Sequence, residues 1–209
     1  MNRTIKLLMV SDIFVLTGFG LIQPILAIFI NDGVAGGSIF SAGLASTLFL
    51  LTKSVVQLPF SKYIDGSRNK RRWLLLGTLM TAIVPVLYIF VNNIYQVYIA
   101  EIVYGVGSGL AYPTWVGLYT TNLKEGQESF EWSIYSTLTG LGSAATAAVG
   151  ASIAHFVGFK LTFIATGILC ILGSMILLFL DQKSSEDLEE EIPHIRDTKT
   201  KSRSDLCCD

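Results

Sequence analysis

Long apolar stretches, separated by short polar or glycine-rich segments, make up most of the sequence as far as residue 180. A helix that crosses a bilayer needs about 20 predominantly apolar residues. Stretches of this kind predict six transmembrane helices, over residues 5–30, 40–60, 73–91, 95–119, 132–156 and 161–180. Because the segments between them are short, consecutive helices should be antiparallel neighbours.

The composition supports a membrane protein. Of the 209 residues, 51% are hydrophobic and 15% are charged, whereas a soluble domain carries about 25% charged residues. The net charge of −1 gives no general attraction to nucleic acid, so the lipid bilayer is expected as a partner and nucleic acid is not. The first apolar stretch is too long for a signal peptide and has no small-residue cleavage site, so no cleaved leader is expected.

The distribution of Lys and Arg predicts the orientation of the chain, because these residues accumulate on the cytoplasmic side of multi-pass proteins. Apart from the C-terminal segment, one side has only Lys160, and the other has Arg3, Lys6, Lys62, Arg68, Lys70, Arg71, Arg72 and Lys124. We therefore expect a multi-pass protein of the plasma (inner) membrane with both termini in the cytoplasm.

The character of the sequence changes after residue 180. Residues 182–209 are rich in charge and poor in aromatic side chains, a composition that is typical of disorder. The sequence thus predicts a transmembrane domain over residues 1–181 and a disordered cytoplasmic tail over residues 182–209. Cys207 and Cys208 near the end are candidates for lipidation or metal binding, although they do not form a CaaX box.

Asp12 and Lys53 are ionisable residues inside the first and second predicted helices. A charge in the membrane interior is unfavourable, so such a residue points to a function. Both lie roughly 9–10 Å from the cytoplasmic ends of their predicted helices, at 1.5 Å per residue. We therefore expect an ion pair between them. Two alternatives stay open: the pair only neutralises its own charges, or Lys53 extends to the lipid headgroups.

Glu101 lies in the fourth predicted helix, near its external end, and polar and aromatic residues follow it along one helical face. Such a stripe suits substrate contact or proton coupling; the alternative is a hydrated acid near the membrane surface. The candidates for substrate contact or proton coupling are Glu101, Asp12, Lys53, Gln23, Gln57, Tyr104, Tyr112 and Trp115.

Four segments carry a resemblance to a known family. FSKYIDGSRNKRRWLLLG places Asp65 before a cluster of cations, and EIVYGVGSGLAYP in the fourth helix places alternate glycines before Pro113. The first helix contains GFGLIQP, and the fifth contains the small-residue run GLGSAATAAVGAS. In this order on six helices, they resemble the major facilitator superfamily, whose motif A is Gly-x-x-x-Asp-Arg-x-Gly-Arg-Arg and whose motif B is Arg-x-x-x-Gly-x-Gly.

The sequence departs from both motifs. Ser61 stands at the first glycine of motif A, its cations fall later, at residues 70–72, and Glu101 occupies the position of the arginine of motif B. The resemblance covers residues 5–180. It implies that Asp65 braces a cytoplasmic gate, that the first and fourth helices line the transport cavity, and that the second and fifth form the contact between two halves.

Family members typically have two six-helix halves, each a 3+3 inverted repeat. The resemblance therefore implies an all-α membrane fold that corresponds to one half. Two copies in parallel would reproduce both halves, so a homodimer is expected, and the small-residue face of the fifth helix is a candidate interface. A separate chain as the second half, or a truncated gene, is the alternative.

The expected function is transport of a small molecule or ion by alternating access, with proton coupling as an additional hypothesis. The alternative is a non-transporting membrane scaffold or regulatory subunit that recruits partners through its tail. The sequence has no catalytic constellation, metal-ligand spacing or phosphate-binding glycine loop, so neither enzymatic activity nor a cofactor is expected.

Overall fold

The computed structural model describes residues 3–67 and 69–180. Within these residues the chain forms only α-helices, which confirms the expected all-α class. They are α1 (Arg3–Ile22), α2 (Leu26–Gly33), α3 (Ile39–Asp65), α4 (Lys70–Ile89), α5 (Ile94–Asn122), α6 (Glu128–Phe156) and α7 (Phe159–Leu177). The predicted tail, with Cys207 and Cys208, lies outside the described residues.

The first predicted helix is in fact two helices, because the chain turns at Gln23–Ile25 between α1 and α2. Pro24 explains this break: its ring lacks an N–H donor and clashes with the preceding helical turn. The prediction of one continuous helix over residues 5–30 is therefore wrong. In contrast, Pro59 and Pro85 lie inside helices that continue through them.

Among the described residues, α1, α3, α4, α6 and α7 are long and apolar enough to cross a membrane. This supports a multi-pass membrane protein. The 29-residue α5 does not qualify by composition, since Gln96, Glu101, Ser108 and several glycines lower its hydropathy. The fourth predicted span, residues 95–119, corresponds to α5 and therefore stays a prediction.

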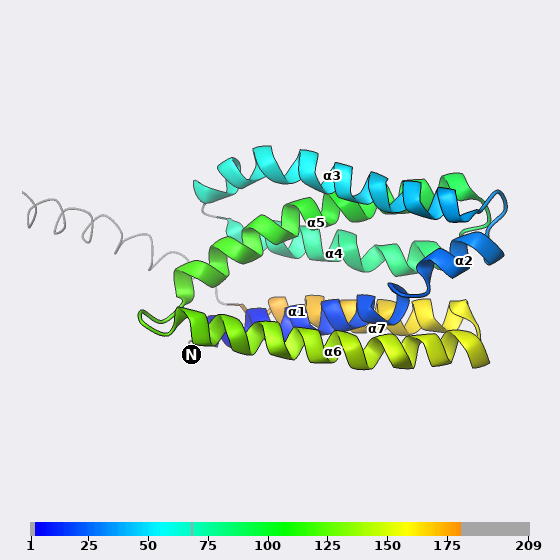
Figure 1. Cartoon of the computed structure of the whole chain (residues 1–209). Helices are drawn as coiled ribbons and strands as arrows, with labels where there is room; N and C mark the ends of the chain where they lie inside the picture. The colour runs from blue at the N-terminus through cyan, green and yellow to red at the C-terminus, as the bar shows by residue number, and fades with distance from the viewer. Residues whose placement is uncertain (1–2, 68, 181–209) are drawn as a thin grey trace, which may run out of the picture.

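The long helices pack as two groups of three, α3 with α4 and α5, and α1 with α6 and α7 (Figure 1). Contact between α4 and α7 joins the two groups, and the short α2 packs against α3 at one end. Helix α1 also touches α5. The polar stripe of α5 and the acid of α1 therefore lie on neighbouring elements.

The glycines of α5 allow the close approach of its neighbours. A Cβ atom at Gly105 would lie 2.8 Å from the Phe49 carbonyl oxygen of α3, and one at Gly109 would lie 3.1 Å from the Lys53 carbonyl oxygen. Small residues permit such backbone contact between membrane helices. The packing of α5 against α3 thus fixes the position of Lys53 beside α5.

The small-residue face of α6 is used within the chain. A Cβ atom at Gly142 would clash with Thr17, and one at Gly150 would clash with the Leu21 backbone, both on α1. These two glycines pack α6 against α1, so the expectation that they contact a second copy is wrong. Ala145 and Ala148, which are exposed on α6, stay candidates for that contact.

Helices α3 and α6 are the least buried of the spanning helices. Only 17% of the most apolar part of α3 and 11% of that of α6 is buried, against 61% in α1. Their exposed side chains include large aliphatic residues such as Leu51 and Leu58 on α3 and Leu141 on α6. These two helices therefore present most of their apolar surface outside the chain.

Candidate functional site

Two cavities lie along α1, α3 and α5. The first, which we call the Glu101 cavity, has a volume of about 180 Å³ and includes Gln23 and Glu101 in its lining. The second, the Asp12 cavity, has a volume of about 250 Å³ and includes Asp12 and Lys53. The structure therefore distributes the ionisable residues predicted for one site between two adjoining cavities.

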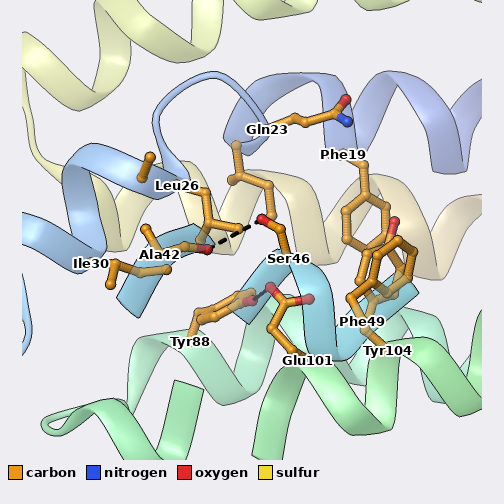
Figure 2. Close-up of a pocket in the computed structure, with 12 residues that line it drawn as sticks. Phe19, Gln23, Leu26, Ile30, Ala42, Ser46, Phe49, Tyr88, Glu101 and Tyr104 are labelled. Atoms are coloured by element: carbon orange, nitrogen blue, oxygen red, sulfur yellow. Dashed lines mark hydrogen bonds between the residues drawn. The ribbon is translucent and has the colours of Figure 1, made fainter. Parts of the chain in front are cut away.

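An aromatic stack forms the wall that the two cavities share. Tyr104 of α5 lies between Phe19 of α1 and Phe49 of α3, with ring centroids 4.6 Å and 4.3 Å apart and nearly parallel planes. The three rings line both cavities and gather beside Glu101 in Figure 2. We call this triple the Tyr104 stack; its rings separate the two cavities.

Glu101 is buried and has a specific partner. Its side chain is 3% exposed, and its carboxylate accepts a hydrogen bond from the Tyr88 hydroxyl of α4 (Figure 2). Tyr88 in turn stacks on Phe163 of α7 at 5.3 Å and packs edge-on against Phe29 of α2. Such burial argues against the interpretation of Glu101 as a hydrated acid near the membrane surface.

Asp12 and Lys53 line the same cavity without forming the expected ion pair. The Asp12 carboxylate instead accepts a hydrogen bond from the Tyr135 hydroxyl of α6. The Lys53 ammonium lies over the ring of Tyr112, 4.8 Å from its centroid, and 6.0 Å from that of Phe49. The prediction of an Asp12–Lys53 ion pair is therefore wrong.

Helix α3 extends beyond its predicted end. Helix α3 continues to Asp65, so Lys53 lies 12 residues, about 18 Å, before its end. Asp12 lies nine residues, about 14 Å, from the start of α1, so the equal distances from helix ends on which the prediction rested do not hold. The Lys53 ammonium lies against the Tyr112 ring in the Asp12 cavity, and its extension to the headgroups stays an alternative.

A cluster of four aromatic rings joins α5 to α6 next to Asp12. Trp115 and Tyr119 of α5 pack on Trp132 and Tyr135 of α6, with ring centroids between 4.7 and 6.5 Å apart. The Trp115 indole nitrogen also donates to the Leu8 carbonyl oxygen of α1, at 3.4 Å. The cluster therefore holds Tyr135 against Asp12 and ties the two helix groups together.

The other predicted site residues divide between the cavities and the surface. Tyr112 and Trp115 line the Asp12 cavity, and Gln23 lines the Glu101 cavity from the turn after α1. Gln57 is half-buried on α3 and lines neither of these two cavities. Asp65 is the exposed last residue of α3, so its role at a cytoplasmic gate stays a prediction.

Two contacts in the candidate site were not predicted. Tyr88 and Tyr135, the hydrogen-bond donors to Glu101 and Asp12, come from other helices. Tyr135 lies 123 residues from Asp12 in the sequence, and no local spacing relates the two. The only available signal was the placement of a tyrosine inside an apolar helix, where its hydroxyl needs a partner.

Comparison of the sequence with known proteins identifies its family. The sequence model of the Major Facilitator Superfamily matches residues 8–205. The chain is 22% identical over 189 residues to the quinolone resistance protein NorA of Staphylococcus aureus, an overlap of 88% of this chain and 47% of NorA. It is 24% identical over 177 residues to an uncharacterised MFS-type transporter of Methanocaldococcus jannaschii, with 84% of this chain and 45% of that protein covered.

The chain thus spans about half the length of these relatives. The family match extends over nearly the whole sequence, and the family consists of transporters and not of enzymes. Together, the helical membrane fold and this match support one conclusion: the chain belongs to the major facilitator superfamily.

Proposed function

We propose that this chain is a half-size transporter that moves a small solute by alternating access. The observation that carries the proposal is the pair of cavities on opposite sides of the Tyr104 stack, each with a carboxylate in its lining. In alternating access, a central site opens to one side of the membrane at a time. The Tyr104 stack separates two compartments that would open in turn.

The proposal includes a second six-helix half. Helices α3 and α6 present exposed apolar faces, and the chain spans about half the length of its relatives. We favour a second copy, in a parallel homodimer, as the partner that covers these faces; a different chain is the alternative. In this arrangement α5 also crosses the membrane, which brings the number of spans to six, and both termini are cytoplasmic.

Glu101 is the proposed proton-coupling acid, with Asp12 as a second candidate. The Tyr88 hydroxyl holds the Glu101 carboxylate in one orientation at the wall of its cavity. An acid in such a cavity can take up a proton when the cavity opens to one side and release it when the cavity opens to the other. The name of NorA refers to quinolone resistance, so quinolones are the first solutes to test.

The test is solute-driven proton flux in proteoliposomes that contain the whole chain and a pH-sensitive dye. We expect a quinolone gradient to drive flux above that of protein-free vesicles, Glu101→Gln to abolish this coupled flux, and Glu125→Gln to leave it unchanged. Glu125 is a matched control because it is an exposed acid between α5 and α6. If a panel of quinolones and other small solutes drives no flux above the protein-free level, the transporter proposal is wrong and the non-transporting scaffold is favoured.

A further inference from the structure

Lys53 is the single cationic residue in the linings of the two cavities, both of which consist of described residues. It lies near the middle of α3, and its ammonium contacts the face of the Tyr112 ring. No carboxylate of the described part of the chain forms an ion pair with it, and the Asp12 carboxylate in the same cavity is already bound by Tyr135. A cation inside a membrane-spanning helix is a candidate functional group, and the charge of Lys53 suits an anionic ligand.

The hydroxyl groups of the Asp12 cavity support this reading. Ser11, Thr78 and Thr81 donate their hydroxyl protons to backbone carbonyl oxygens, so these protons are already used. In contrast, the hydroxyls of Ser108 and Tyr112 line the cavity and make no hydrogen bond with any described residue. The unused polar groups around Lys53 are therefore able to donate hydrogen bonds to an anion.

The remaining lining is aromatic. The Tyr104 stack forms one side of the Asp12 cavity, and Trp115 and Tyr135 contribute two more rings. Aromatic walls favour a flat ring in a ligand, through stacked or edge-to-face packing. A volume of about 250 Å³ suits a small molecule of this kind.

We propose that the Asp12 cavity binds an aromatic organic anion, with its anionic group on Lys53 and its ring against the aromatic walls. The proposal rests on the proposed function, because it assumes that the cavity belongs to the solute path. The Glu101 cavity has no cation in its lining and would not hold the anionic group. In the Asp12 cavity, Lys53 is the group that would favour an anion, and the opposing Asp12 carboxylate is held by Tyr135.

The test is isothermal titration calorimetry on the whole chain in mild detergent, with titrations into empty micelles subtracted. The probes are biphenyl-4-carboxylate and biphenyl-4-carboxamide, which have the same shape and differ in charge. A hydrogen bond to a charged group contributes enough for the carboxylate to bind about tenfold more tightly than the amide, or better. Lys53→Met should remove this preference, and Lys53→Arg should keep most of it. Lys62→Met, an exposed cation on the same helix, is the matched control and should change nothing.

Equal affinity of the wild-type chain for the two probes would overturn the proposal, as would a preference for the carboxylate that survives Lys53→Met. The wild-type comparison decides the question even if the Lys53→Met variant does not fold. Failure of the proposed function has a different signature: vesicles without solute-driven flux, formed from a chain that still prefers the carboxylate in solution.

Discussion

The Tyr135 hydroxyl of α6 donates a hydrogen bond to the Asp12 carboxylate of α1, and Tyr88 of α4 does the same for Glu101 of α5. Each acid in the two cavities therefore has a tyrosine donor from a different helix. The tyrosines also belong to aromatic clusters that link the two helix groups, Tyr135 with Trp115 and Tyr88 with Phe163. Orientation of each acid is thus coupled to packing between the groups.

Removal of the Tyr88 hydroxyl should release the Glu101 side chain. We expect Tyr88→Phe to reduce solute-driven proton flux severalfold and to lower the free energy of unfolding by about 1.5–3 kcal/mol, the range for a hydrogen bond to a charged group. Flux in proteoliposomes and thermal unfolding in detergent measure the two effects. Tyr95→Phe is the control, because Tyr95 is 73% exposed at the start of α5. Equal effects of both substitutions would argue against a specific role for the Tyr88 hydroxyl.

Truncation of Tyr104 should open the wall between the cavities. Tyr104 stacks on two rings, so Tyr104→Ala removes both contacts, each worth about 0.5–1.5 kcal/mol beyond area burial. We expect a proton leak in the absence of solute. Tyr104→Phe keeps the stack, so vesicles that contain this variant should not leak protons. If Tyr104→Ala vesicles leak no protons without solute and show normal solute-driven flux, the stack is not a barrier to protons.

The close packing of α5 on α3 should make Gly109 intolerant of a side chain. A Cβ atom there would lie 2.9 Å from the Val56 Cβ atom, so Gly109→Ala should destabilise the protein by about 1–3 kcal/mol through overpacking. Gly117 lies on the same helix, and a Cβ atom there would meet nothing within 4 Å. Gly117→Ala should therefore be neutral or stabilising, by up to about 1 kcal/mol, since alanine favours helix. Thermal unfolding of the two variants in the same detergent checks this; equal melting temperatures would contradict the packing argument.

A second copy should contact the exposed face of α6. In a background without native cysteines, we expect Val149→Cys to form a disulfide-linked dimer in membranes under mild oxidation. Ile168→Cys on α7 is the control, because the two residues are similarly exposed, at 51% and 55%. Cross-linking at residue 168 but not at residue 149 would place the contact elsewhere, and a strictly monomeric chain in mild detergent would contradict the homodimer.

The sequence pattern predicted the positions of the long helices and the residues of α5 that line the two cavities. Apolar length located the long helices, and the spacing from Glu101 to Trp115 correctly placed Glu101, Tyr104, Tyr112 and Trp115 along cavity walls, because one helical face carries them all. Apolar length alone did not show that Pro24 divides the first predicted helix in two.

The pairings between helices could not be predicted. The expected Asp12–Lys53 pair assumed equal distances of the two residues from their helix ends, whereas α3 continues past residue 60 to Asp65. The partners of Asp12 and Lys53 depend instead on the packing of α1 against α6 and of α3 against α5. Small residues such as Gly109 and Gly150 fix that packing through backbone contacts that hydropathy does not encode.

Alternating access across the Tyr104 stack is tested most directly by accessibility at one position in each cavity. Ser46 lines the Glu101 cavity and Ser108 lines the Asp12 cavity. In vesicles that contain either Ser46→Cys or Ser108→Cys in the cysteine-free background, a water-soluble thiol reagent reports how open each cavity is as a pH gradient is applied and reversed. The account predicts reciprocal labelling: conditions that speed the reaction at residue 46 slow it at residue 108. Labelling rates that rise and fall together, or that do not respond to the gradient, would contradict it.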